Sequence, residues 1–254
     1  MQEVLSVSLV SLQRGLQRLE LIAGNLANAS TPAYRRQVAV AGAVGSQPMP
    51  FSAWLMASDA AEVGRMRATE LSVLPDQRAG SLRATGLSLD IALVGDGYFE
   101  LSSESGPVWT RRGDWTLDGV GRLVSRQGYP VLGQGGEIFL THDHPHIDAA
   151  GNVYASKADA SNQPLARLKV MFADAGTQMK SVGDGLWVPE GTMAPQASTG
   201  FQIRQGYLEN ANVDVMREMV DLMRTVRQVE SMQKVSMAYD DMTGQAIRKL
   251  GDLS

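Results

Sequence analysis

Apolar residues near both ends of the chain recur at alternating spacings of four and three, the pattern of one side of a coiled-coil helix. A helix cannot bury such a row against itself, so each end is predicted to be a long helix with a helical partner. The row near the N-terminus consists of Leu5, Leu9, Leu12, Leu16, Leu19, Ala23 and Leu26. The row near the C-terminus consists of Val215, Met219, Leu222, Val226 and Val229 and, after a shift, Met232, Val235, Tyr239, Met242 and Ala246.

The middle of the chain has the pattern of short strands. Residues 87–93 alternate apolar with small or polar side chains, as a half-buried strand does. Asp118-Gly119 is a hairpin-turn signal, and further short apolar runs follow at regular spacing. The predicted fold class is therefore α+β, with long N- and C-terminal helices forming a coiled coil and an inserted all-β antiparallel domain, either a sandwich or a barrel.

These patterns divide the chain into four predicted segments. The first helix ends before Pro32, because the residue that precedes a proline is pushed out of the helical region. The segments are an N-terminal coiled-coil helix over 1–30, an irregular linker with short elements over 31–85, the β domain over 86–205 and a C-terminal coiled-coil helix over 206–254.

The last helix carries apolar residues beyond its heptad row. Met216, Met223 and Met237 lie off that row, and apolar residues around so much of a helix indicate contacts on more than one side. Methionine adapts its shape to non-identical neighbours, so the pattern favours a multi-walled helical assembly over simple core filling. Asn212 is expected to cap the start of this helix.

The composition excludes several classes of function. The 254-residue chain has a net charge of −4, so no basic field points to nucleic acid. It contains no cysteine, which excludes disulfides, thiolate catalysis and cysteine-type zinc sites. The first 30 residues lack the pattern of a cleaved signal peptide, and no run of about 18 apolar residues predicts insertion into a membrane.

The histidines are the best candidate for a metal site. His142, His144 and His146 alternate, so a regular strand would place them on one face. Pro145 interrupts such a strand, however, and a solvated loop explains the run equally well. We therefore predict no catalytic, cofactor-binding or metal-ligating residue and no cofactor. A metal-binding protein or an enzyme that uses these histidines is the alternative from another class.

Three stretches of the chain, in this order, resemble the flagellar basal-body rod and hook family. They are residues 25–35 (NLANASTPAYR), residues 89–99 (LDIALVGDGYF) with 110–114 (TRRGD), and residues 206–213 (GYLENANV). Ala33 stands where the family usually has glycine. The family-motif residues are Asn25, Asn28, Ser30, Thr31, Pro32, Tyr34, Gly206, Leu208, Glu209, Asn212 and Val213.

The resemblance implies a structural subunit of the bacterial flagellar basal-body rod that polymerises through its terminal helices and transmits torque across the periplasm. The two heptad rows would form the assembly seam. A proximal-rod subunit is favoured, and a distal-rod subunit is the alternative. The implied partners are copies of the chain, other rod proteins and the flagellar type III export apparatus, which uses an uncleaved N-terminus. No enzymatic activity, nucleic acid, small-molecule substrate or membrane insertion is expected.

Overall fold

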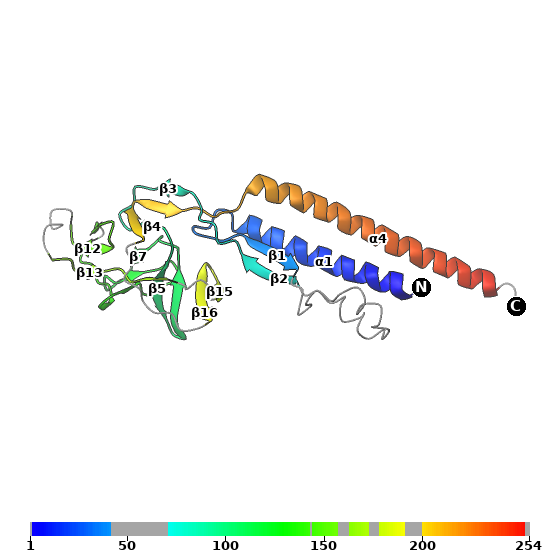
Figure 1. The fold of residues 1–254 in the computed structure, drawn as a ribbon, viewed down its shortest axis with the longest axis horizontal. Helices are drawn as coiled ribbons and strands as arrows, with labels where there is room; N and C mark the ends of the chain where they lie inside the picture. The colour runs from blue at the N-terminus through cyan, green and yellow to red at the C-terminus, as the bar shows by residue number, and fades with distance from the viewer. Residues whose placement is uncertain are drawn as a thin grey trace, which may run out of the picture. The chain divides into compact units, whose positions relative to one another are not determined.

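The computed structural model of the chain describes residues 2–41, 71–142, 144–156, 163–172, 178–190 and 200–251. The chain forms two compact units, which are drawn together in Figure 1. The helical unit contains Met1–Ala27, Arg36–Gln77 and Asp214–Ser254, and the strand unit contains Asn28–Arg35 and Arg78–Val213.

The helical unit pairs one helix from each end of the chain. Helix α1 covers Gln2–Ala27 and helix α4 covers Val215–Gly251, and the two lie side by side (Figure 1). Gly15 of α1 lies at a close approach, because a methyl group on it would come within 2.7 Å of Val229 Cγ2 on α4. The small residue therefore lets the two helices pack closely at this level.

The side of α4 that packs on α1 is partly polar. Glu218 is 1% exposed, Thr225 is 3% exposed and Val229 is 6% exposed. Leu222, which lies between Glu218 and Thr225, and Met232, which follows Val229, are half-buried. The spacings of four and three place all these residues on the side of α4 that carries Val229.

Helix α4 begins with a cap that differs from the predicted one. The Asp214 carboxylate accepts a hydrogen bond of 3.2 Å from the Arg217 amide, and the Asp214 carbonyl accepts one of 2.9 Å from the Glu218 amide. The expectation that Asn212 caps this helix is wrong. Asn212 instead donates its side-chain amide to the carbonyl oxygen of Arg78 at 2.7 Å.

A two-stranded ribbon completes the helical unit. Strand β1 (Gln37–Ala41) pairs antiparallel with β2 (Leu71–Pro75). The Asn25 side chain on α1 donates to the Gln37 carbonyl at 2.9 Å and accepts from the Gln37 amide at 2.8 Å, so it binds β1 as a neighbouring strand would. Arg36 forms an ion pair with Glu218 of α4. A two-stranded ribbon is marginal alone, and these contacts attach it to both helices.

The strand unit consists of several small antiparallel sheets. Its largest sheet has the strand order β14-β5-β6-β16-β15, and β11-β12-β13 forms a three-stranded sheet. Strands β17 and β4, β18 and β3, β7 and β8, and β10 and β9 form pairs. The strands are β3 (Leu82–Ala84), β4 (Ile91–Val94), β5 (Tyr98–Ser103), β6 (Gly106–Thr110), β7 (Thr116–Leu117), β8 (Leu123–Val124), β9 (Leu132–Gly133), β10 (Gly136–Glu137), β11 (His146–Ile147), β12 (Asn152–Tyr154), β13 (Ala166–Arg167), β14 (Val170–Met171), β15 (Gln178–Gly183), β16 (Leu186–Glu190), β17 (Gln202–Gln205) and β18 (Tyr207–Glu209).

One apolar cluster joins these sheets. Phe99 of β5 is fully buried and meets Trp115 edge to face, with 4.8 Å between ring centroids. Leu123 of β8, Val153 of β12 and Ile203 of β17 belong to the same cluster. The five-stranded sheet, the three-stranded sheet and the β17–β4 and β7–β8 pairs all contribute residues to this cluster, so none of these four has to be stable alone.

Three tight turns of the strand unit repeat one geometry. In each turn the amide of the first residue donates to the carbonyl oxygen of the fifth, and the carbonyl oxygen of the first accepts the amide of the fourth. The side-chain oxygen of the first residue accepts the amide of the fifth. The fourth residue is a glycine in the left-handed region, with φ between 81° and 89°. The turns begin at Asp118, Ser125 and Asp148, and their glycines are Gly121, Gly128 and Gly151.

The predicted fold class is wrong. The described part of the strand unit is a set of small sheets around one core, and it is neither a single sandwich nor a barrel. The predicted coiled coil is overturned as well, because residues expected in its seam, such as Met219, Val226 and Val235, remain 37% to 59% exposed on α4. The polar residues Glu218 and Thr225 take the inward side instead, which an apolar repeat does not reveal.

Replacing Gly113 by alanine is expected to destabilise the strand unit by roughly 3 kcal/mol, because the added methyl group would overlap the carbonyl oxygen of buried Ile91. Gly119→Ala is the matched control, since nothing lies within 4 Å of its added methyl group. The control should stay within about 0.5 kcal/mol of the parent chain. Chemical denaturation measures both, and equal effects would contradict the close packing at Gly113.

Asp118 is expected to give the chain a stability that depends on acid pH. The hydrogen bond from the Arg122 side chain lowers the pKa of the Asp118 carboxyl group from its ordinary value of 3.8. Its contribution is therefore complete above the ordinary pKa and is lost as the pH falls through the lowered one. The difference in unfolding free energy between the parent chain and Asp118→Asn should shrink below about pH 4. A difference that stays constant with pH would contradict this assignment.

Candidate assembly surface and buried ion-pair cluster

A single carboxylate organises the centre of the strand unit. Glu209 at the end of β18 has a side chain that is 1% exposed, and each of its oxygens meets a different arginine. Oε1 lies 3.1 Å from Arg35 Nη2 and also accepts the Gly80 amide at 2.9 Å, while Oε2 accepts from Arg111 Nε at 2.9 Å. The buried charge is thus paired and hydrogen-bonded on both oxygens.

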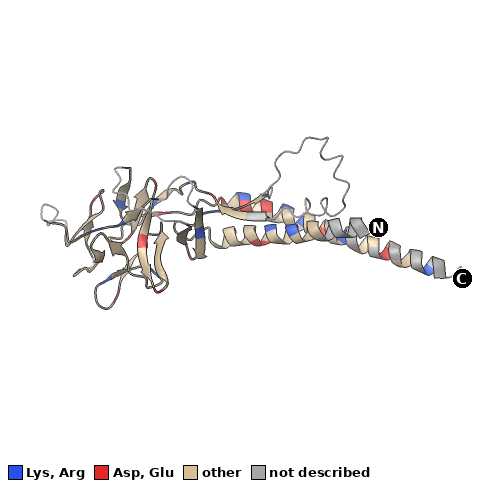
Figure 2. Ribbon diagram, turned by 60° about the horizontal axis from the view of Figure 1, so that its bottom comes forward, with Lys and Arg blue, Asp and Glu red and all other residues tan. Residues whose placement is uncertain are grey.

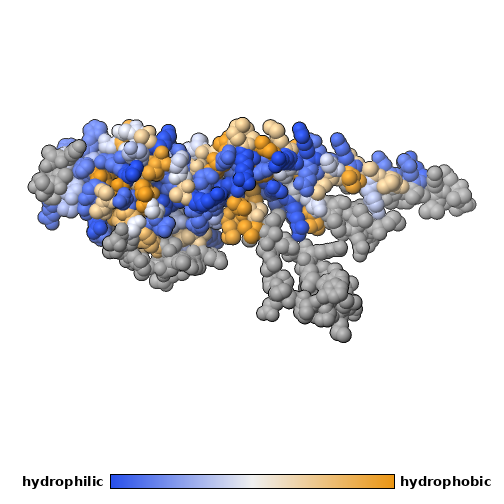
Figure 3. Space-filling view, turned by 45° about the horizontal axis from the view of Figure 1, so that its top comes forward, coloured by the Kyte–Doolittle hydropathy of each residue, from blue (hydrophilic) through white to orange (hydrophobic). Residues whose placement is uncertain are grey.

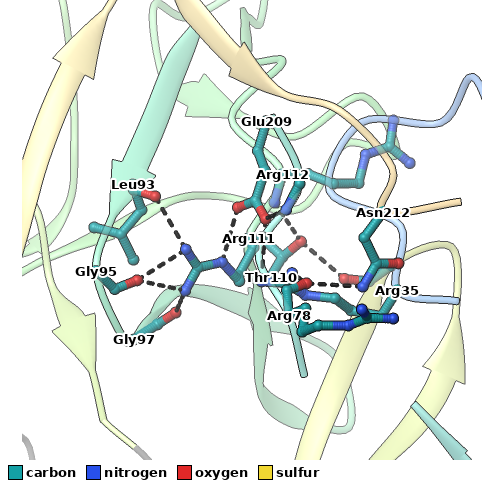
Figure 4. Close-up of polar contacts among 12 residues, drawn as sticks. Arg35, Arg78, Leu93, Gly95, Gly97, Thr110, Arg111, Arg112, Glu209 and Asn212 are labelled. Atoms are coloured by element: carbon teal, nitrogen blue, oxygen red, sulfur yellow. Dashed lines mark hydrogen bonds and ion pairs between the residues drawn. The ribbon is translucent and has the colours of Figure 1, made fainter. Parts of the chain in front are cut away.

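Arg111 uses its whole guanidinium group in this cluster (Figure 4). Besides Glu209, it donates to the carbonyl oxygens of Leu93, Gly95 and Gly97 at distances between 2.9 and 3.0 Å. Those carbonyls belong to the end of β4 and the turn into β5. A guanidinium group has five N–H donors, so Arg111 satisfies the turn while it neutralises Glu209.

The cluster brings together the three stretches that resemble the rod family. Arg35 comes from the first stretch, Arg111 and the turn at Gly95 from the second, and Glu209 from the third. The Ala33 amide also donates to the Glu209 carbonyl at 2.7 Å, and the Asn212 amide donates to the Tyr34 carbonyl at 3.2 Å. Segments far apart in the sequence are therefore held at one point.

The turn that presents Arg35 keeps the conformation usually given to glycine. Ala33 is 3% exposed and has φ 55°, in the left-handed region that disfavours side chains. The hydrogen bond from its amide to Glu209 helps to fix that conformation. The departure from the family's glycine therefore leaves the turn geometry in place, at a cost of about 1 kcal/mol.

The remaining family-motif residues hold the backbone of this region. Asn25 binds Gln37, and the Asn28 carbonyl accepts the Thr31 amide at 3.0 Å. Gly206, with φ 77°, accepts the Thr85 amide at 2.8 Å. Leu208 is buried, Pro32 and Val213 are half-buried, and Ser30 is exposed.

This cluster is suited to structure rather than to chemistry. Glu209 and Arg111 are almost completely shielded from solvent, and their polar atoms are occupied by one another and by backbone groups. A general acid or base must exchange protons with a substrate, and neither group has room for one.

The other candidate feature is an apolar surface of the helical unit (Figure 3). We call it the exposed stripe: Val215, Met216, Met219, Val220, Met223 and Val226, which are 37% to 73% exposed. Helical spacing places these residues on one broad side of α4, next to the side that faces α1. Charged residues of both signs occupy other positions along the two helices, as Figure 2 shows. An apolar stripe bordered by charges is typical of an interaction site.

The residues of the predicted assembly seam have different environments. Leu12, Leu19, Leu26, Leu222, Met232 and Tyr239 are half-buried and Val229 is buried. Leu16, Ala23, Val215, Met219, Val226, Val235 and Met242 are exposed. The side chains of Leu5, Leu9 and Ala246 lie outside the described residues. The role of the seam in assembly stays a prediction.

His144 and His146 contact different groups. His144 Nδ1 lies 2.8 Å from Ser88 Oγ, and the His146 ring stacks on Tyr154 with 6.2 Å between centroids. Both line an open cleft of about 470 Å³ with Ser88 and Tyr207. In the described part of the chain, no three His, Cys, Asp or Glu side chains are grouped to bind a metal ion.

Arg111 lies within one of the motif stretches but is not among the predicted functional residues, and neither is Glu218. A signal existed for Arg111: three motif stretches each carry a charge beside apolar residues, which suggests that the charges meet. Nothing in the pattern distinguished Glu218 from a solvated glutamate.

No described helix has the length and apolarity that crossing a bilayer requires.

Glu209→Gln is expected to destabilise the strand unit by about 3–5 kcal/mol, because it leaves two buried arginines without their anion. Glu137→Gln is the matched control, since Glu137 pairs with Arg122 at 3.3 Å on the surface, where both side chains are at least 35% exposed. That change should cost less than about 1 kcal/mol. Guanidinium denaturation of the purified chain compares the two, and similar losses would rule out a central role for Glu209.

Comparison with known protein families finds two matches on this chain. Residues 204–249 match the family described as "Flagellar basal body rod FlgEFG protein C-terminal". Residues 92–155 match "Flagellar hook protein FlgE/F/G D1 domain". The first match contains Glu209 and the exposed stripe, and the second contains Arg111 and the turns at Asp118 and Asp148.

Individual relatives cover nearly the whole chain. The flagellar basal-body rod protein FlgF of Escherichia coli (strain K12) is 30% identical over 242 residues, and that of Salmonella typhimurium is 31% identical over 244 residues, each alignment covering 91% of both chains. FlgG of Bacillus subtilis is 24% identical over 239 residues, which cover 89% of this chain and 90% of the relative. The chain therefore belongs to the family of flagellar basal-body rod proteins, as a structural subunit of the FlgF type.

Proposed function

We propose that the chain joins the rod by packing the exposed stripe of α4 against copies of itself and against other rod proteins. The observation that carries this proposal is the exposed stripe itself: its six apolar side chains are neighbours on the surface of α4, and α1 does not cover them. Fully burying a valine or methionine side chain stabilises a contact by about 1.5–3 kcal/mol. Six partly exposed residues therefore offer a substantial driving force for association.

The geometry of α4 suits a subunit with neighbours on several sides. One side packs on α1 through Val229, and the exposed stripe occupies an adjacent side, so a partner can bind without displacing α1. A contact between two different surfaces of identical subunits does not close on itself and generates an extended helical array. The predicted seam residues of α1, of which Leu16 is 51% exposed, would contribute to such contacts.

The remaining parts of the proposal follow from membership of the family. The assembled subunit would transmit torque as part of the rod across the periplasm, without catalysis and without a bound cofactor. It would reach its place through the flagellar type III export apparatus. The relatives named FlgF are more similar to this chain than FlgG of Bacillus subtilis is, which supports a proximal rather than a distal position.

The exposed stripe is tested by Val226→Asp in a strain whose own copy of the gene is deleted. A carboxylate that must be buried without a partner costs several kcal/mol, so the variant should be incorporated about tenfold less, or not at all. Basal bodies are purified with detergent, the subunit is quantified in them, and motility is scored.

The matched control is Gln228→Asp, which adds the same charge at an exposed position of α4 outside the stripe. It should be incorporated normally and restore motility. Circular dichroism checks that both variants keep their helices and strands. Normal incorporation of Val226→Asp would contradict the proposed contact, whereas absence of the unaltered chain from basal bodies would contradict the rod function.

A further inference from the structure

Three of the six residues in the exposed stripe are methionines. We propose that Met216, Met219 and Met223 form a reversible oxidation site, at which a peroxide converts the stripe from an apolar surface to a polar one before the subunit is incorporated. The effect on assembly rests on the proposed function of the stripe. The chemical selectivity of the site does not.

Methionine supplies the only sulfur atoms that an oxidant can attack in this chain. The chain contains 13 methionines and no cysteine, so methionine is its only sulfur-containing residue. Met216 is 73% exposed, Met223 is 59% exposed and Met219 is 41% exposed, whereas Met171 in β14 is only 4% exposed. Met237 and Met242, farther along α4, are exposed as well, but they lie outside the stripe. Because an oxidant must reach the sulfur, the stripe should react well before Met171.

The spacing of the three methionines concentrates the effect. Positions 216, 219 and 223 are three and four residues apart, so their side chains follow one another on the same side of α4. Val215, Val220 and Val226 surround them. Oxidation would therefore change half the side chains of a single contact surface.

The reaction is a two-electron oxygen transfer. The thioether sulfur attacks one oxygen of hydrogen peroxide, the O–O bond breaks, and a sulfur–oxygen bond forms. The proton on the transferred oxygen moves to the departing hydroxide, so the products are methionine sulfoxide and water. Sulfur is oxidised and peroxide is reduced, and methionine sulfoxide reductases reverse the change.

A sulfoxide oxygen is a strong hydrogen-bond acceptor that the stripe cannot satisfy. The other stripe residues are valines, which have no side-chain donors, so any donor would have to come from the bordering residues Arg217, Arg224 and Arg227. Burying the oxidised stripe would leave these acceptors without partners inside the stripe, and this disfavours association. The oxidised helix remains helical, because the three side chains are turned away from α1.

The chemical part is tested on the purified full chain with hydrogen peroxide and peptide mass spectrometry. Cleavage after arginine separates Met216 from a peptide that carries Met219 and Met223, and Met171 lies in another peptide. Sulfoxide should form at the three stripe positions about tenfold faster than at Met171. Equal rates would overturn the site. In denaturant the difference should vanish, because it depends on the fold.

The consequence is tested in the deletion strain with two triple variants. Met216→Gln, Met219→Gln and Met223→Gln together imitate the polarity of the sulfoxide, and the corresponding leucine variant keeps an apolar stripe that peroxide does not oxidise. The glutamine variant should enter purified basal bodies about tenfold less than the leucine variant. Both residues favour helices, so circular dichroism should match.

The outcomes distinguish this inference from the function on which it rests. Equal incorporation of the two triple variants, with Val226→Asp excluded, would overturn the oxidation switch and keep the assembly stripe. Normal incorporation of Val226→Asp would overturn the stripe itself. The oxidation rates would still decide whether Met216, Met219 and Met223 are oxidised ahead of the buried Met171.

Discussion

The strand unit depends on the pairing of one buried carboxylate with two arginines. Glu209 lies at the end of β18, and its two oxygens hold Arg35 and Arg111 from distant parts of the chain. Arg111 in turn holds the carbonyl groups of the turn between β4 and β5. A buried ion pair is a poor source of net stability, but leaving one member alone is costly. The cluster thus acts mainly to exclude arrangements in which the three stretches do not meet.

The helical unit shows how misleading an apolar repeat can be. The most regular apolar row of α4 predicts the contact with its partner helix, yet the buried side includes Glu218 and Thr225. Glu218 can lie there because Arg36 pairs with it. Polar residues on the inner side leave the apolar ones available outside, as expected for a subunit that is completed by its neighbours.

Local patterns could be read from the sequence, whereas long-range pairing could not. Asp118-Gly119 predicts a turn that the structure contains, and the strand Ile91–Val94 begins within residues 87–93, where the alternating pattern predicts a strand. The division into small sheets depends on which strands pair across more than a hundred residues, as β3 and β18 do. No local signal encodes such pairing. The site shows the same limit, since the motifs were visible but their meeting at Glu209 was not.

The carbonyl oxygen of Arg78 gives the strand unit a mechanical property. It accepts hydrogen bonds from the side chains of Arg35 and Asn212, and the Asn212 amide bonds the Tyr34 carbonyl. Residues 35, 78 and 213 are positions where the chain passes between the two units. A load applied along any one of these chain segments is therefore shared with the others at their base. A force that pulls on one segment therefore acts on the hydrogen bonds of all three, so no single segment carries the full force.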